Sequence, residues 1–354
     1  MIFSALSRHT YMTREIQQSQ PEAAAAVRAG DDSAFSALVA RHERELRVHC
    51  YRMLGSLDES EDLVQETFLR AWRRRETFQG RSSVRAWLYR IATNACLDAL
   101  ARRPRPEPVS DVADRAVKAK ASFEVPWLQP YPDTLLAGMA PSEDEPDAAV
   151  VAKETIELAF MVAIQHLPPR QRAVLILRDV LGWPAKDAAE LLDSSVASVN
   201  SALARAREGL KQQLPERRLE WAPGSDPTRE ERALLRRYVD ATERADAHDL
   251  MVLMREDARF SMPPEPGVWV GRDAILAAWT DGCAFDTEKF GHMRGLLTRA
   301  NMQPAVACYL RQPGDSEYRP LGLDVIRIEE GLVAEIVMFP PNLFPAFDLP
   351  PTLE

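Results

Sequence analysis

The sequence predicts a multidomain protein in which two all-α units are followed by an α+β domain. Apolar residues recur three and four positions apart through much of the first 214 residues, as in amphipathic helices. Beyond residue 228, two such segments are followed by short β-branched and aromatic runs that predict strands. Two linkers, 105–150 and 216–227, separate the three parts, and a chain of 354 residues is long enough for them.

The composition predicts a cytoplasmic protein without a metal or a cofactor. No apolar run approaches the length of a membrane span, and the N-terminal apolar stretch is too short for a signal peptide. Four cysteines lie far apart without paired metal spacing: Cys50, Cys96, Cys283 and Cys308. Residues 1–25 are expected to form a disordered tail, in which Met12 is as good a start as Met1.

Three helices are expected between residues 26 and 104. The first has an N-cap among Asp31, Asp32 and Ser33 and ends at Gly55. In the second, an apolar stripe should be buried, formed by Val64, Phe68, Ala71 and Trp72. Another stripe of that helix carries Asp62, Gln65, Glu66, Leu69 and Arg73. The third should bury Val84, Trp87, Leu88, Ile91 and Ala95 and present Arg90, Asn94 and Asp98.

Charge concentrates in the same part of the chain. Between Phe68 and Pro106 there are ten arginines and two acidic residues, a net of about +8, although the whole chain carries −9. Such a segment is typical of nucleic-acid binding, and the alternative is a solvated basic helix pair. The loop ETFQGRSS combines an aromatic ring, basic groups and hydroxyls, which can stack on an unpaired base and hold its phosphates.

The first linker, 105–150, is rich in proline and acidic residues, which rule out a long helix. Within it, Pro126–Asp133 is an apolar and aromatic island. A flexible tether has no need of such residues, so we expect the island to dock. Its docking residues are Trp127, Leu128 and Tyr131.

Residues 151–215 predict further helices that end in a helix-turn-helix. The last helix should be buried through Val196, Val199, Leu203, Ala206 and Leu210. Its outward face then carries Asn200, Ser201, Ala204 and Arg205, and a helix-turn-helix presents such a face to the DNA major groove. Asp193 stands in the turn, where it tolerates the left-handed conformation.

Residues 228–345 predict an α+β cone. Two helices should face the core through Leu235, Tyr238, Val239, Leu250 and Leu253. Strands are expected at ARFSMPP, at a Trp–Val–Gly edge, at PAVACYLRQ and in LGLDVIRIEEGLVAEIVMFP, with a further helix at DAILAAWTDGC. Glu330–Gly331 marks a hairpin turn.

Three segments carry a resemblance to known families. DLVQETFLRAW followed by WLYRIATNACLD resembles conserved region two of extracytoplasmic-function (ECF) sigma factors, and LPPRQRAVLILRDVLGWPAKDAAELL resembles sigma region four. The C-terminal part resembles the SnoaL-like branch of the NTF2-like fold. The implied domains are sigma-2 at 26–104, sigma-4 at 151–215 and a SnoaL-like domain at 228–345.

The resemblance also implies site residues and a mechanism of binding without bond-making. Contacts to the beta and beta' subunits of core RNA polymerase fall on Asp62, Gln65, Glu66 and Leu69. The −10 promoter element is melted and captured by Phe78, Arg81, Ser82, Arg90 and Asn94. The −35 element is read by Asn200, Ser201 and Arg205, although Asn200 and Ala202 occupy positions that are often basic. Separately from the resemblance, the short linker raises the effective concentration of the SnoaL-like domain, so we expect this domain to contact the sigma domains within the chain and to regulate them in cis.

Two alternatives stay open from the sequence. One is a helix-turn-helix regulator that works without polymerase. The other is a sigma-fused small-molecule enzyme or ligand sensor of the ketosteroid-isomerase type, which needs a carboxylate near an apolar cavity. Candidates for such a pocket are Asp324, Tyr238, His292 and Arg259.

Overall fold

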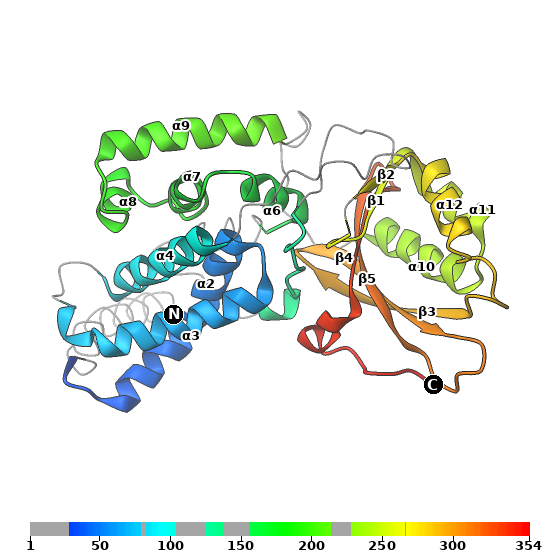
Figure 1. Ribbon diagram of the computed structural model, residues 1–354, viewed down its shortest axis with the longest axis horizontal. Coiled ribbons are helices and arrows are strands. Elements are labelled where there is room, and N and C mark those ends of the chain that lie inside the picture. Colours follow the sequence, from blue (N-terminus) through cyan, green and yellow to red (C-terminus); the bar gives the residue numbers. More distant parts are fainter. Residues whose placement is uncertain (1–27, 79–82, 104–124, 137–155, 214–227, 266) are drawn as a thin grey trace, which may run out of the picture. The chain divides into compact units, whose positions relative to one another are not determined.

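The structure is a computed structural model that describes residues 28–78, 83–103, 125–136, 156–213, 228–265 and 267–354. The chain forms two compact units (Figure 1). The first contains the described residues within 1–54, 58–104 and 168–207, and the second those within 55–57, 105–167 and 208–354. Among the described residues, no helix is both long and apolar enough to cross a membrane.

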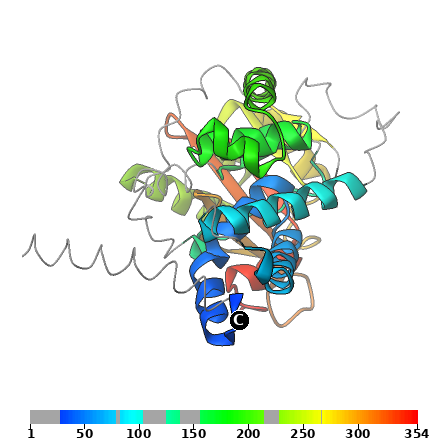
Figure 2. The same cartoon turned by 90° about the vertical axis from the view of Figure 1, so that its left-hand side faces the viewer.

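The first unit is helical. Its elements are α2 (Asp32–Leu54), α3 (Leu57–Arg73), the short η1 (Arg75–Thr77), α4 (Val84–Arg102), α7 (Pro169–Leu175), the π-helical turn η3 (Ile176–Val180), α8 (Ala185–Leu191) and α9 (Val196–Gln213). The unit boundaries fall within two of these helices, because Leu57 and residues 208–213 belong to the second unit. Two views agree that α7 and α8 lie between α4 and α9 (Figures 1 and 2). The helices begin where the sequence supplies caps: Asp31 accepts from the amides of Ser33 and Ala34, and Ser83 accepts from Ala86.

Most of the stripes expected in these helices are buried. Val64, Phe68 and Ala71 of α3 lie in the core, as do Val199 and Leu203 of α9. The prediction for Val196 is wrong, because its side chain is 43% exposed. It is the first residue of α9, where the helix begins outside the packed stripe.

The second unit combines a sheet with flanking helices. Its helical elements are η2 (Asp133–Leu135), α6 (Leu158–Gln165), α10 (Arg229–Glu243), α11 (Ala247–Leu253), α12 (Arg272–Asp281) and η5 (Pro341–Phe347). Its strands are β1 (Met254–Ser261), β2 (Val268–Val270), β3 (His292–Ala300), β4 (Gln303–Arg311), β5 (Arg319–Glu329) and β6 (Leu332–Phe339). The sheet order is β2-β1-β6-β5-β4-β3, in which only β1 and β6 pair in parallel.

Different helical elements pack on the two faces of this sheet. Alternate residues such as Ile326 and Ile336 form one core with Leu235 and Tyr238 of α10. On the other face, Tyr309 packs against Phe344 of η5 with ring centroids 5.2 Å apart. The central strands β4, β5 and β6 are therefore buried over their central residues, whereas the edge strand β3 is partly exposed.

The α+β class and the hairpin turn at Glu330–Gly331 are confirmed: both residues have positive φ, 54° and 74°. Strand β3 was not predicted, because HMRGLLTRA lacks a clear alternation of apolar and polar residues. Gly295, in the middle of β3, has a packing role. A Cβ at this position would lie 3.1 Å from Val239 Cγ1, so the glycine lets α10 approach the strand.

Candidate polymerase and nucleic-acid interface

The polar stripe of α3 is accessible. Asp62 and Gln65 are exposed, and Leu69 is 50% exposed although it is apolar. Glu66 is half-buried and accepts a 2.7 Å hydrogen bond from Arg70 Nε, which lowers the pKa of Glu66. Beside the stripe, an open hollow of about 380 Å³ is lined by Glu59, Asp62, Leu63, Ala99, Arg102 and Arg103. A polar face with one exposed leucine and a hollow is suited to a protein partner.

The residues implied for the −10 element do not form one continuous surface. Asn94 is exposed on α4, whereas Phe78 is buried and packs against Trp87 with ring centroids 5.2 Å apart. The half-buried Arg90 donates to Asp193 at 2.6 Å. Arg81 and Ser82 lie outside the described residues. In this conformation Asn94 is accessible, Phe78 is covered and Arg90 is engaged.

Helix α4 is oriented by a carboxylate that sequence reasoning missed. Glu45 of α2 accepts from Arg85 Nε at 2.8 Å and from the Tyr89 hydroxyl at 3.3 Å, and it contacts His42 Nδ1 at 2.5 Å. Burial alone would raise the pKa of Glu45, but the hydrogen bond with His42 and the Arg85 charge lower it on balance. A carboxylate inside a helix whose pattern is apolar gave no distinct signal in the sequence.

The helix-turn-helix has the expected geometry. Asp193 adopts φ of 47° in the turn, and Ser195 caps α9 by accepting from the Ser198 amide at 3.1 Å. Arg207 forms a bidentate pair with Asp179, at 2.8 Å for both contacts, which fixes α9 to η3. The three residues implied for the −35 element are all exposed on one helix: Asn200, Ser201 and Arg205.

The apolar island of the first linker docks within the second unit, on the turn between β3 and β4. Leu128 and Tyr131 are buried, and Trp127 is half-buried. The Tyr131 amide donates to Asn301 Oδ1 at 2.7 Å, and the Asn301 amide donates to the Tyr131 carbonyl at 2.8 Å. Asp133 accepts from Arg299 Nε at 2.9 Å and from the Met302 amide at 2.8 Å. These paired hydrogen bonds fix the position of the island on the β3–β4 turn.

The same turn holds the start of α6. Asn301 Nδ2 donates to the Ile156 carbonyl at 2.5 Å, and Gln303 Oε1 accepts from the Leu158 amide at 3.0 Å. Asn301 is fully buried and has φ of 54°, a conformation that asparagine tolerates. Its side chain therefore bonds both chain segments at once. The sequence signal for it is only the asparagine between two strand patterns.

Of the pocket candidates in the C-terminal part, the structure brings two together. Tyr238 donates to Asp324 Oδ2 at 3.0 Å, and Cys308, which sequence reasoning missed, contacts the same oxygen at 3.4 Å. His292 is exposed, and Arg259 lies 3.9 Å from Glu335. Burial raises the pKa of Asp324 to about 6. Among the described residues, no group of three His, Cys, Asp or Glu side chains is arranged to hold a metal ion.

Three family models match the chain: sigma-70 region 2 over residues 38–105, sigma-70 region 4 over 157–210 and a SnoaL-like domain over 235–336. Together with the helical unit and the α+β sheet, they define a sigma-70-type factor with an additional C-terminal domain. The crystal structure of the Mycobacterium tuberculosis extracytoplasmic function sigma factor SigJ has the same fold, with a TM-score of 0.56 at 22% identity, covering 89% of this chain and 99% of that one.

Two curated relatives show which class of sigma-70-type factors the chain resembles. The ECF RNA polymerase sigma factor SigG of Mycobacterium tuberculosis (strain H37Rv) is 42% identical over 324 residues, covering 90% of this chain and 85% of the relative. The ECF RNA polymerase sigma factor SigW of Bacillus subtilis is 30% identical over 188 residues, covering 53% of this chain and 92% of the relative. The chain belongs to the ECF RNA polymerase sigma factors, as the sequence patterns predicted.

Proposed function

We propose that this sigma factor binds core RNA polymerase, recognises the −35 and −10 promoter elements and helps to open the DNA, in the cytoplasm. It acts by binding and not by catalysis. The polymerase contacts are Asp62, Gln65, Glu66 and Leu69 of α3. Their exposure opposite the buried Val64 and Phe68 supports this assignment, because a partner can cover them without disturbing the core.

The DNA contacts are assigned to two helices and one loop. Asn200, Ser201 and Arg205 form the exposed face of α9, which suits a major groove. Asn94 and Arg90 of α4, with Arg81, Ser82 and Phe78 of the preceding loop, are assigned to the −10 element. The high positive charge of this segment supports the assignment, since phosphate contacts dominate affinity for DNA. We keep the domain boundaries at 26–104, 151–215 and 228–345.

We further propose that the SnoaL-like domain regulates the sigma domains in cis. The observation that carries this proposal is the β3–β4 turn, where Asn301 bonds both the linker island at Tyr131 and the chain before α6 at Ile156. The region-4 match begins at residue 157, so the first helix of that region belongs to the same compact unit as the SnoaL-like domain. A change at this turn therefore reaches both the linker and region 4.

The island also contacts the chain between α2 and α3. The Gln129 amide donates to the Gly55 carbonyl at 2.9 Å, and Ser56 Oγ donates to Gln129 Oε1 at 2.9 Å. Gly55 and Ser56 separate α2 from α3, the helix assigned to polymerase binding. The docked island thus contacts the chain next to that helix.

In-vitro run-off transcription with purified core polymerase tests both parts of the proposal. Wild-type protein should support a defined transcript from a cognate promoter. Asn301→Gly keeps the left-handed turn but removes the side-chain bonds, so it should free residues 125–136 for amide exchange and change the transcript yield. Met302→Gly is the matched control, because Met302 has φ of 60° and bonds through its backbone amide and carbonyl, both of which glycine retains. Equal exchange and yield in all three proteins would refute the cis regulation, and absence of any transcript would refute the sigma activity.

A further inference from the structure

We infer that Asn200 and Val196 of α9 make the −35 element of this protein's promoter specific for neighbouring A·T pairs. Asn200 is assigned to the hydrogen-bonding edge of an adenine, and Val196 to the 5-methyl group of a nearby thymine. The inference rests on the proposed role of α9 in −35 recognition and adds the bases that this helix reads.

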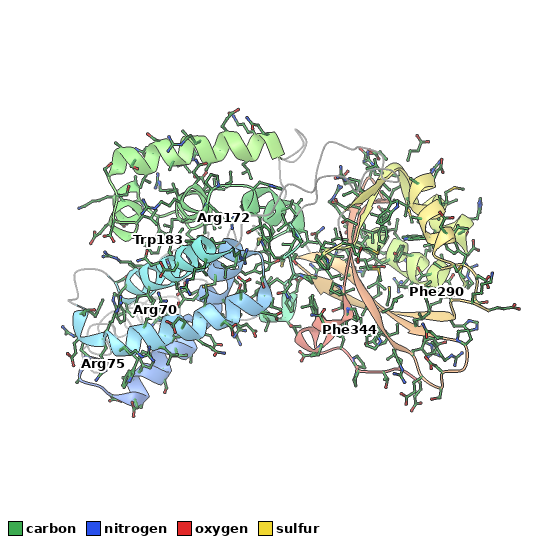
Figure 3. All side chains as sticks on the ribbon, viewed as in Figure 1. Arg70, Arg75, Arg172, Trp183, Phe290 and Phe344 are labelled. Carbon is green, nitrogen blue, oxygen red and sulfur yellow. The ribbon has the colours of Figure 1, made fainter. Side chains whose placement is uncertain are left out.

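Helix α9 presents two rows of side chains on its exposed face, because residues four positions apart lie above one another. The first row is Val196, Asn200 and Ala204, and the second is Ala197, Ser201 and Arg205; all six are exposed. Figure 3 shows side chains of α9 that project away from α7. This face can therefore enter a major groove with both rows directed at base edges.

Val196 lies at the end of α9 that meets the bases. It is the first residue of the helix, and the N-terminal residues of a recognition helix contact base edges. Its side chain is 43% exposed, whereas Val199 and Leu203 of the same helix are buried. A single exposed valine is ordinary on a protein surface. Its place on the recognition face, one turn before Asn200, is what assigns it to a base.

The base that suits Val196 is thymine, whose 5-methyl group is apolar and lies in the major groove. Packing one methyl group against the valine removes it from water and favours binding by about fourfold. Four residues rise about 6 Å along a helix, and base pairs are stacked about 3.4 Å apart. Val196 and Asn200 can therefore reach bases that are no more than about two pairs apart.

The base that suits Asn200 is adenine. Its amide has one acceptor and one donor group, which match the N6 donor and the N7 acceptor of adenine, whereas guanine offers two acceptors. A good bidentate pair of this kind discriminates against the wrong base by about fivefold to 150-fold. Among the described residues the Asn200 amide has no partner, whereas Arg207 of the same helix is held by Asp179 at 2.8 Å.

This assignment gives a meaning to the departure from the family pattern at residue 200, where a basic residue is often found. Arginine or lysine bonds O6 and N7 of guanine. Asparagine at this position therefore replaces a preference for guanine by one for adenine, and Asn200→Arg should reverse the change.

A selection from random DNA tests the role of Asn200. Full-length protein assembled with core polymerase binds promoter-length duplexes of random sequence, and the bound duplexes are sequenced. Wild type should enrich an adenine in the −35 element with a thymine close to it on either strand. Asn200→Arg should shift the ratio of adenine to guanine at that one position by at least about fivefold, while Asn200→Gln, which keeps the amide, should keep the adenine. Glu208→Gln makes the exposed surface of α9 more positive by the same single charge and should change no base.

Uracil tests the methyl contact of Val196. The enriched duplex is remade with uracil in place of thymine, one position at a time, which removes only the 5-methyl group. Wild type should lose about fourfold in affinity at one −35 position, and Val196→Ala should show no such loss there. Val252→Ala is the matched control, because Val252 of α11 is 48% exposed, and it should lose the same fourfold as the wild type.

The failures of the two proposals are distinguishable. An unchanged base preference in Asn200→Arg, or an equal effect of uracil in Val196→Ala and wild type, would overturn the inference, provided that circular dichroism melts show folded variants. In that case a wild-type holoenzyme that transcribes from the enriched duplex leaves the proposed function standing. A wild-type protein that enriches no sequence and yields no transcript would overturn both.

Discussion

Tyr238 and Asp324 meet inside the core of the C-terminal domain, where the tyrosine hydroxyl donates to one carboxylate oxygen at 3.0 Å. The other oxygen, Asp324 Oδ1, has no hydrogen-bond partner among the described residues. Burial is the main reason that the pKa of Asp324 rises from 3.8 to about 6, against the hydrogen bonds from Tyr238 and Cys308, which lower it. The folded domain therefore favours the protonated carboxyl group more than water does.

This raised pKa predicts that the C-terminal domain loses stability as pH rises. The folded state binds a proton more tightly than the unfolded state, so the stabilisation is complete below pH 4 and is lost through pH 6. The difference of about two pKa units corresponds to about 3 kcal/mol. Asp324→Asn should raise the melting temperature at pH 7.5 and much less at pH 5. The control Asp315→Asn removes an exposed charge of the same domain, and an equal response in both variants would contradict the assignment.

The first unit should instead lose stability as pH falls. Burial, with the charge of Arg52, lowers the pKa of His49 to about 3, and its Nε2 lies 2.9 Å from Thr93 Oγ1. Because the folded state holds the ring neutral, stability is complete above pH 6.5 and is lost as pH falls toward 3. At pH 5 the loss is about 2 kcal/mol. Amide exchange in α2 and α4 at pH 5 should slow in His49→Gln relative to the wild type, and unchanged exchange would exclude this role.

The α3 stripe should bind polymerase without maintaining the fold. Asp62→Ala combined with Gln65→Ala should lower affinity for core polymerase at least about tenfold, or about 1.4 kcal/mol. Thermal stability should change little, because both side chains are exposed. Glu61→Ala, an exposed neighbour on the same helix, is the control. Retained affinity in the double variant would remove these residues from the interface.

Strand opening and duplex recognition are expected to depend on two different residues, Asn94 and Arg205. Asn94→Ala should spare the closed complex but reduce strand opening, which permanganate footprinting of unpaired thymines detects. Arg205→Ala should instead weaken duplex binding by about 1–3 kcal/mol, with a dependence on the upstream sequence. Equal defects at both steps in both variants would contradict the division between α4 and α9.

The sequence predicted what local patterns determine. The burial of Val64 and Phe68 follows from helical period, and the turn at Glu330–Gly331 follows from its residue types. Contacts between distant segments left no such pattern. Asn301 bonds chain positions 145 and 170 residues away, and the pairing of Arg90 with Asp193 depends on how two helical regions pack. Phe78 was expected to offer its ring to a base, yet Trp87 covers it in this conformation.

The anchoring of the linker at the β3–β4 turn limits where a peptide can be inserted into the chain. Asp133 and Leu158 are both bonded to that turn, through the Met302 amide and Gln303 Oε1 respectively. Asp133 and Leu158 are thus held at the same turn although 25 positions separate them in the chain. A peptide tag inserted between Tyr131 and Asp133 would therefore break the docking bonds and should lower the melting temperature of the second unit.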